Sequence, residues 1–341
     1  MINIADSQVA SSHLLWRDNR RLLCEDHRAG RTQLRGRPVH LKIELTNFCN
    51  LACPMCPHPR MRRPVGYMDP ALFRKIITEA TPQLEFAYLH HLGESLFHGR
   101  IGELIRYARS CGVRVGLSTN ATILSPRKAR ALLEAGLDLL VISLDAATPA
   151  TYARMRVGAR WASTLHNVHH FLELKRRLGS RTAAVIQMVV TDENQHEVAA
   201  FTDQWRRCGE QVMIKEARDW AGQVPLRLPG RQNGCAGPCR MLWTELTVLW
   251  DGTVVPCANH FERHNVLGDL RQQSLTEVWN GPAMKALRAA HLQNQLGQIP
   301  VCGTCPRHSF EYETFIAADQ LAQRLAHYRL SDDLSPRPGL S

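Results

Sequence analysis

Residues 40–56 read HLKIELTNFCNLACPMC, a short apolar run that ends in three closely spaced cysteines. The run at 40–46 predicts a β-strand, so the cysteines lie in the loop that follows it. Cys49, Cys53 and Cys56 have the spacing C-x3-C-x2-C. Thiolates bind iron–sulfur clusters and zinc alike, but three of them are one fewer than a structural zinc site uses. Three thiolates at this spacing can hold three corners of an iron–sulfur cubane and leave the fourth iron open to another ligand, but the residue types alone do not choose between such a cluster and zinc.

Further apolar runs follow this one and alternate with amphipathic stretches. The expected strands cover 40–46, 84–94, 113–121, 137–146, 182–190 and 211–217, and helical patterns lie at 69–80, 99–112, 125–136 and 164–179. Six such β–α units predict an α/β fold with a parallel sheet, either open or curved into a partial barrel. Ligand sites in such folds gather at the carboxyl ends of the strands, which is where polar side chains follow the apolar runs here.

The bulk composition narrows the class of protein. The 341 residues carry 42 Lys and Arg against 31 Asp and Glu, a formal net charge of +11. The arginines are dispersed, with short clusters such as Arg60–Arg63, and aromatic residues make up only 6%, so a solvated basic surface is favoured over nucleic-acid binding. No apolar stretch approaches the roughly 20 residues that span a bilayer, and no signal peptide is recognised. We therefore expect a cytoplasmic protein with neither a membrane nor a nucleic-acid partner.

A second group of cysteines follows residue 220. Its members are Cys239, Cys257, Cys302 and Cys305, and the last two form a C-x2-C pair. The stretch 244–257 reads as a hairpin that turns at Asp251-Gly252, and a helical pattern covers 275–291. Clustered cysteines in a cytosolic protein indicate metal or redox chemistry, and four of them can hold zinc or an iron–sulfur cluster. A small domain held together by metal is therefore expected here.

The first cysteine loop and the segments behind the next strands resemble the radical SAM superfamily over residues 38–220. That superfamily places CxxxCxxC after the first strand of a partial (β/α)6 barrel of the TIM type. Three later segments match its motifs in order: Leu92-Gly93-Glu94-Ser95 resembles GGEP, Ser118-Thr119-Asn120 resembles the start of STNG, and Ser143 to Asp145 with Tyr152 to Arg156 resembles S-x-D…Y-x-x-x-R. Leu92, Ser95 and Ala121 depart from the pattern.

This resemblance implies the cofactors of the first site. A SAM-binding [4Fe–4S] cluster would be held by Cys49, Cys53 and Cys56. Contacts to S-adenosylmethionine would come from Glu94, Asn120, Ser143 and Arg156.

The second cysteine group resembles the SPASM/twitch extensions of the same superfamily. It shares their Asp-Gly hairpin, Leu267-Gly268-Asp269 and Glu277-Val278-Trp279-Asn280. Full SPASM domains carry further cysteines after the C-x2-C pair, whereas none follows Cys305. The resemblance thus implies the shorter form, with one auxiliary [4Fe–4S] cluster on Cys239, Cys257, Cys302 and Cys305. The implied domains are an N-terminal extension (1–37), a radical SAM partial barrel (38–220), an auxiliary-cluster domain (221–310), and a C-terminal helix and tail (311–341).

Within the superfamily, the chain looks similar to aminocyclitol dehydrogenases of butirosin-, spectinomycin- and hygromycin-type antibiotic biosynthesis. The resemblance implies an oxidoreductase in which a 5′-deoxyadenosyl radical takes a hydrogen atom from a secondary carbinol of an aminocyclitol or sugar. The small-molecule substrate becomes a ketone, and its electron passes to the auxiliary cluster. A flavodoxin- or ferredoxin-type protein is expected to supply the electron for SAM cleavage.

Three other functions stay open. One is a radical SAM epimerase or decarboxylase of a carbohydrate, with the thiol of Cys235 as the hydrogen-atom donor. Another is maturation of a peptide, and a third is a metal-bearing module that binds nucleic acid without catalysis. The expected catalytic residues are Cys235 for the epimerase and, for the dehydrogenase, Arg218 at the end of the sixth strand. The expected substrate contacts are Gln187, Glu216, Asp219 and His91.

Overall fold

The computed structural model describes residues 4–208, 210–226 and 238–305, and it gives side chains from residue 15 onward. Cys235 and the expected C-terminal helix and tail (311–341) lie outside the described residues. No described helix is both long and apolar enough to cross a membrane.

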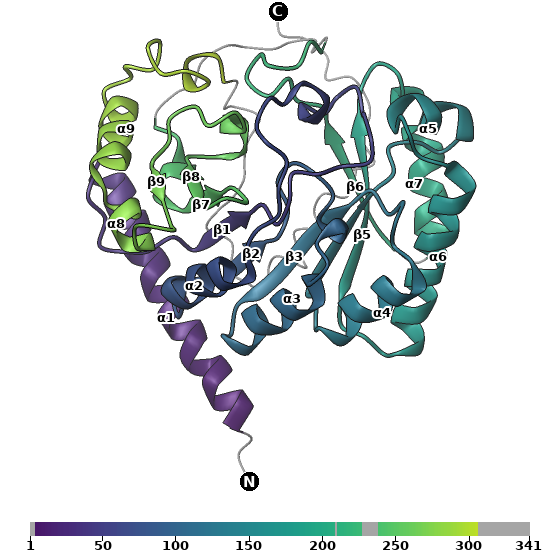
Figure 1. Cartoon of the computed structure of the whole chain (residues 1–341), viewed down its shortest axis with the longest axis horizontal. Coiled ribbons are helices and arrows are strands. Elements are labelled where there is room, and N and C mark those ends of the chain that lie inside the picture. Colours follow the sequence, from purple (N-terminus) through teal and green to yellow (C-terminus); the bar gives the residue numbers. More distant parts are fainter. Residues whose placement is uncertain (1–3, 209, 227–237, 306–341) are drawn as a thin grey trace, which may run out of the picture.

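Six parallel strands form the curved sheet of a partial TIM-type barrel, as predicted (Figure 1). They are β1 (His40–Ile43), β2 (Phe86–Tyr88), β3 (Arg114–Thr119), β4 (Leu139–Ser143), β5 (Ala183–Val190) and β6 (Gln211–Glu216). The strands lie side by side in chain order, β1 to β6. Strand β2 is shorter than the predicted 84–94. The chain turns away after Tyr88, and Gly93 has the positive φ of 87° that glycine tolerates.

Helices cover the outer face of this sheet (Figure 1). They are α2 (Pro70–Ala80), α3 (Ile101–Ser110), α4 (Pro126–Glu134), α5 (Pro149–Met155), α6 (Trp161–Arg177) and α7 (Val198–Arg207). Asp69, Ser125 and Thr148 cap three of them by accepting a backbone N–H, and a proline follows each cap. Buried side chains such as Phe73, Leu132 and Phe171 form a large apolar core on this side of the sheet.

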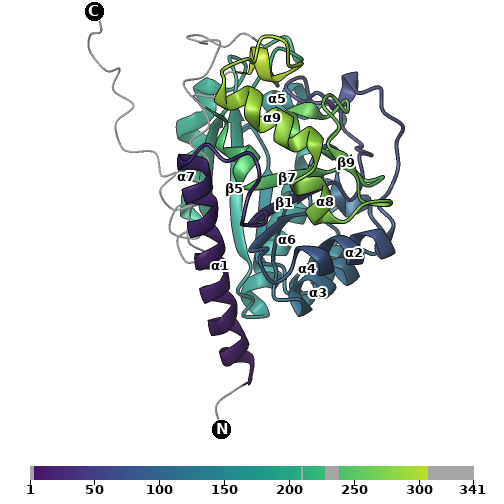
Figure 2. The same cartoon turned by 90° about the vertical axis from the view of Figure 1, so that its left-hand side faces the viewer.

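The N-terminal extension contains a helix, α1 (Ile4–Arg28), that the sequence patterns did not indicate. It runs beside the barrel, and its first turns project beyond the body of the molecule (Figures 1 and 2). The indole of Trp16 donates to the carbonyl of Pro82 (2.9 Å), and Arg20 forms an ion pair with Glu85. These contacts anchor α1 to the segment that leads into β2.

The auxiliary domain continues the same sheet. Strand β7 (Glu245–Val248) pairs in parallel with β1, on the side away from β2, and β8 (Thr253–Val255) and β9 (Gly268–Asp269) add in antiparallel order. The predicted hairpin at Asp251-Gly252 is thereby confirmed. The helical pattern over 275–291 forms two helices, α8 (Leu275–Trp279) and α9 (Pro282–Leu292), because Gly281 and Pro282 interrupt it.

Candidate cofactor and substrate site

The first cysteine group lies in a loop that is braced at the end of β1. The hydroxyl of Thr46 donates to the carbonyl of Gly66 (2.7 Å). The Asn47 side chain donates to the carbonyl of Pro64 (2.9 Å) and accepts from the N–H of Gly66 (2.9 Å). These bonds tie the strand end to the returning chain, and they leave residues 49–56 as a closed loop over the barrel mouth.

The chemistry of these thiols suits a cluster. Burial, with the negative charge of the neighbouring thiolates adding to it, raises the pKa of Cys49 to about 11 and that of Cys56 to about 12. The free thiols of Cys49 and Cys56 therefore stay protonated near neutral pH, and their thiolate forms would require a bound cation. Arg156 Nη1 donates to Cys53 Sγ (3.6 Å), and Asn120 Nδ2 donates to Cys49 Sγ (3.9 Å). Donors to sulfur of this kind stabilise a cluster held by these cysteines.

Two of the predicted SAM contacts, Glu94 and Asn120, lie together behind β2 and β3. The Glu94 carboxylate accepts the N–H of Asn120 (2.7 Å) and the hydroxyl of Thr119 (2.8 Å), and its own N–H donates to the carbonyl of Phe48 (2.7 Å). Burial raises the pKa of Glu94, and these hydrogen bonds partly offset that effect. The carboxylate is thus fixed next to the cysteine loop, where a cationic ligand group would relieve its desolvation.

The other two predicted SAM contacts follow β4. Ser143 Oγ accepts from the Gln187 amide (2.9 Å), so Gln187, predicted as a substrate contact, directly supports the predicted SAM contact Ser143. Arg156 forms an ion pair with Asp145 (2.5 Å) in addition to its bond to Cys53. In this structure Arg156 therefore joins the cysteine loop to β4.

The remaining predicted substrate residues and the predicted catalytic Arg218 differ in burial. Glu216 is exposed at the end of β6, Arg218 is half-buried, and Asp219 is buried at 2% exposure. His91 is held by two other partners. Its Nδ1 faces Glu44 Oε1 (3.0 Å) and its Nε2 faces the carbonyl of Ala258 (2.9 Å). With both ring nitrogens engaged, His91 has none left for a substrate.

The second cysteine group gathers in the auxiliary domain. Burial raises the pKa of Cys257 well above its usual range, and the charges of Cys302, Cys239 and Cys305 raise it further, so the four sulfurs lie near one another. Two neighbours contact these sulfurs, Asn259 Nδ2 at 3.6 Å from Cys305 Sγ and His260 Nε2 at 3.6 Å from Cys302 Sγ. We did not expect Asn259 or His260 from the sequence, although both closely follow Cys257.

The side-chain positions do not decide between zinc and an iron–sulfur cluster. Within the described residues, no three or more His, Cys, Asp or Glu side chains are arranged to hold a single metal ion. Cysteine thiolates bind zinc and iron–sulfur clusters alike, so the residue types leave both open.

A buried charge network connects the barrel to the auxiliary domain. Arg63 forms two hydrogen bonds with the Glu44 carboxylate (2.7 and 2.9 Å), and His91 contacts the same carboxylate. The backbone N–H of Trp250 also donates to Glu44 (3.3 Å). The sequence patterns did not single out Glu44 or Arg63, because nothing local distinguishes Arg63 from the basic run that contains it.

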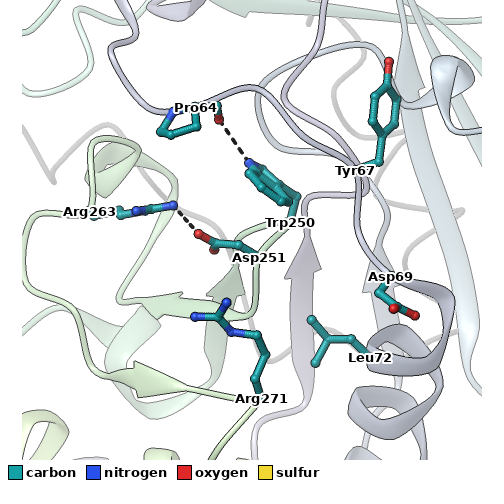
Figure 3. A pocket seen from close by; sticks show the side chains of 8 residues that line it. All are labelled: Pro64, Tyr67, Asp69, Leu72, Trp250, Asp251, Arg263 and Arg271. Carbon is teal, nitrogen blue, oxygen red and sulfur yellow. Dashed lines mark hydrogen bonds and ion pairs between the residues drawn. The ribbon is translucent and has the colours of Figure 1, made fainter.

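A surface pocket of about 320 Å³ opens at the same junction (Figure 3). The indole of Trp250 lies across it and donates to the carbonyl of Pro64 (3.3 Å), and Arg263 pairs with Asp251. Its other lining residues are Tyr67, Asp69, Leu72 and Arg271. None of the residues predicted to bind SAM or substrate lines this pocket, so it is separate from the barrel mouth.

Two family models match the chain. The radical SAM superfamily model matches residues 43–204, and the SPASM iron–sulfur cluster-binding domain matches residues 239–306. The first range contains Cys49, Cys53 and Cys56, and the second contains the four auxiliary cysteines.

Relatives from three organisms cover most of the chain. A tungsten-containing aldehyde ferredoxin oxidoreductase cofactor-modifying protein of Pyrococcus furiosus is 25% identical over 70% of this chain and 80% of its own. PqqA peptide cyclase of Gluconobacter oxydans is 31% identical over 71% of this chain and 76% of its own. The S-adenosyl-L-methionine-dependent 2-deoxy-scyllo-inosamine dehydrogenase of Niallia circulans is 23% identical over 80% of this chain and 94% of its own.

Solved structures share the fold. BtrN in complex with AdoMet and 2-DOIA matches with a TM-score of 0.54 at 16% identity, over 79% of this chain and 92% of its own. SuiB of Streptococcus suis bound to its precursor peptide SuiA matches with a TM-score of 0.65 at 14% identity, over 79% of this chain and 70% of its own. The chain therefore belongs to the radical SAM superfamily and carries a SPASM domain, and it is an enzyme whose cofactors are iron–sulfur clusters and S-adenosylmethionine.

Proposed function

We propose that this enzyme is a dehydrogenase that oxidises a secondary alcohol of a small molecule, of the aminocyclitol or sugar class, to a ketone. The observation that carries the proposal is the second cysteine group, whose Cys257 closely follows a strand of the same sheet that leads into the first group. A carbon centre that has lost a hydrogen atom must still lose an electron to become a ketone, and a nearby cluster is a suitable acceptor. The 2-deoxy-scyllo-inosamine dehydrogenase among the relatives supports this substrate class.

The bound cofactors would supply a one-electron cleavage of SAM that removes a hydrogen atom from the substrate, and an auxiliary centre that receives the remaining electron. Cys49, Cys53 and Cys56 would hold the first cluster, and Glu94, Asn120, Ser143 and Arg156 would position SAM. Cys239, Cys257, Cys302 and Cys305 would hold the auxiliary cluster. Arg218, at the end of β6, would polarise the substrate hydroxyl while its proton leaves to solvent. The balance is loss of one C–H hydrogen, one hydroxyl proton and one electron.

The test is product analysis with purified, reconstituted enzyme, SAM, a reductant and candidate aminocyclitols, run in D2O. A dehydrogenase gives a ketone lighter than the substrate by two hydrogen atoms, with one 5′-deoxyadenosine per turnover. An epimerase would instead give a product of unchanged formula that carries deuterium. Loss of product in Cys235→Ala with both clusters intact would favour the epimerase and overturn the dehydrogenase.

Peptide oxidation is the second candidate, because PqqA peptide cyclase is among the more similar relatives. It requires the same removal of a hydrogen atom and an electron, so the cofactor sites do not distinguish the two. Incubation with a candidate precursor peptide distinguishes them. A peptide that loses two hydrogen atoms, with every aminocyclitol unchanged, would replace the small-molecule proposal.

A further inference from the structure

The inner face of the barrel changes from apolar to polar at its mouth. On the inner face, Phe86, Leu139, Val141 and Val185 form a small apolar cluster, against which Tyr88 and Met213 pack. Side chains two residues apart share a face of a strand, so the next inward position on each strand can be read directly. Beyond Tyr88, Val141, Val185 and Met213, these next positions are His90, Ser143, Gln187 and Lys215.

Lys215 lies at the level of the cysteine loop. Its register partner on β5 is Val189, which packs against the cluster of Leu51, Cys53 and Met55. The Lys215 ammonium also lies near enough to His90 and Asp145 to influence both electrostatically. Lys215 therefore belongs to the wall of the barrel that faces the predicted SAM site.

His90 presents a hydrogen-bond donor to the same space. The backbone N–H of Ser118 donates to His90 Nδ1 (3.1 Å). Burial lowers the pKa of His90 to about 3, and the positive charges of Lys42 and Lys215 add to that effect, so the ring is neutral. A neutral ring whose Nδ1 accepts carries its proton on Nε2.

The carboxylates around the mouth are already engaged. Glu94 accepts three hydrogen bonds, from Leu96, Thr119 and Asn120, Asp145 pairs with Arg156, and Glu44 is bound by Arg63 and His91. Lys42, the other inward lysine, is paired with Glu245 (3.5 Å). Glu216 follows Lys215 on the opposite face of β6 and is exposed. In the described part of the chain, Lys215 has no ion-pair partner.

We propose that Lys215 and His90 bind an anionic group of the substrate, a carboxylate or a phosphate, at the mouth of the barrel. An ammonium that has no ion-pair partner among the described residues, beside a neutral N–H donor, suits anionic oxygens, and it disfavours the ammonium group of an aminocyclitol. The inference rests on the proposed function, because it takes the barrel mouth as the substrate site. Of the two proposed substrate classes it favours sugars over aminocyclitols, and among sugars those that carry a carboxylate or a phosphate.

The experiment measures binding rather than turnover. Glucuronate, glucose 6-phosphate, glucose and glucosamine share a ring with secondary alcohols and differ in charge. Each is titrated calorimetrically into anaerobic, SAM-loaded wild-type enzyme, Lys215→Gln, Lys215→Arg and the control Lys285→Gln on α9. Retained SAM binding shows that each variant is folded.

We expect at least one anionic probe to bind about tenfold more tightly than glucose, the factor supplied by one charge-assisted hydrogen bond. Lys215→Gln should abolish this preference, whereas Lys215→Arg and Lys285→Gln should keep it. Absence of binding by both anionic probes, a preference for glucosamine, or a preference that survives in Lys215→Gln would overturn the inference. A Lys215-dependent preference without any oxidised product would contradict only the proposed dehydrogenase. Oxidation of a cationic aminocyclitol would contradict only the anion site.

Discussion

Gly93 allows the segment after β2 to pass close to the backbone at the end of β1. A Cβ atom at this position would lie 2.5 Å from the carbonyl oxygen of Thr46 and 2.8 Å from backbone atoms of Asn47. Its φ of 87° is also one that other residues rarely adopt. The close approach carries Glu94 to the cysteine loop, so the glycine positions a predicted SAM contact.

We therefore predict that Gly93→Ala destabilises the apo protein by about 2 kcal/mol or more and weakens SAM binding to the reconstituted enzyme. The matched control is Gly99→Ala, where a new Cβ meets nothing within 4 Å, and it should change stability by less than about 0.5 kcal/mol. Chemical denaturation and equilibrium dialysis with SAM measure the two effects. Equal stability of the two variants would show that the backbone contact is not rigid.

At the scale of elements, β1, the loop after the cysteines and the auxiliary hairpin meet at one buried carboxylate. Glu44, the residue that follows β1, is fully buried. Its carboxylate binds Arg63 from the loop, His91 from the segment after β2, and the N–H of Trp250 in the hairpin. Burial alone would raise the pKa of Glu44, but His91 and Arg63 lower it from 4.5 to about 2. Ionised Glu44 thus stabilises the folded state.

The pH dependence of the protein's stability follows from the lowered pKa of Glu44. A carboxylate whose pKa is lower in the folded state stabilises the protein above its unfolded pKa, and the stabilisation is lost as the pH falls from about 4.5 toward 2. We predict that Glu44→Gln lowers the free energy of unfolding by about 3 kcal/mol at pH 7 and that the difference from wild type shrinks as the pH falls below 4.5. Urea denaturation at several pH values measures it.

Glu134→Gln is the control for this series. Glu134 is 55% exposed and pairs with Arg130 (3.2 Å), so its loss should cost less than about 1 kcal/mol at any pH. A Glu44→Gln penalty that is small at pH 7, or constant with pH, would refute the assignment of a buried ionised carboxylate.

The elements that could be predicted from the sequence are those with local signals. Apolar runs predicted all six barrel strands, and Asp251-Gly252 predicted the hairpin. Helices α1, α5 and α7 had no comparably clear pattern. The buried network could not be predicted, because Glu44 and Arg63 are joined by folding rather than by spacing, and the run Arg60–Arg63 reads as solvated surface. His91 illustrates the same limit, since its contacts with Glu44 and Ala258 depend on the placement of β1 and the auxiliary domain.

At the scale of the whole molecule, the described residues form one nine-stranded sheet that connects the two cysteine groups. Its order, β6-β5-β4-β3-β2-β1-β7-β8-β9, puts β1 beside the auxiliary strands. The first cysteine loop follows β1, and Cys257 follows β8 closely. Because one sheet connects the two sites, the distance between them is fixed. The proposed electron transfer from a substrate to an auxiliary cluster requires such a fixed distance.

This arrangement predicts two independent iron–sulfur sites. Anaerobic reconstitution should give about eight iron atoms per chain, the content of two four-iron clusters. Cys302→Ala with Cys305→Ala should keep about four, as should the triple variant Cys49→Ala, Cys53→Ala and Cys56→Ala, because each group holds its own cluster. Zinc in place of the missing iron would contradict the assignment of the affected group.

The most direct test of the account is electron paramagnetic resonance of these three proteins after reduction, recorded with and without SAM, together with assay of 5′-deoxyadenosine. We predict that SAM alters the signal of the cluster retained in the Cys302→Ala, Cys305→Ala variant, and that this variant still forms 5′-deoxyadenosine. The triple variant should show an auxiliary-cluster signal that SAM does not change, and it should form no 5′-deoxyadenosine. Formation of 5′-deoxyadenosine by the triple variant would contradict the account.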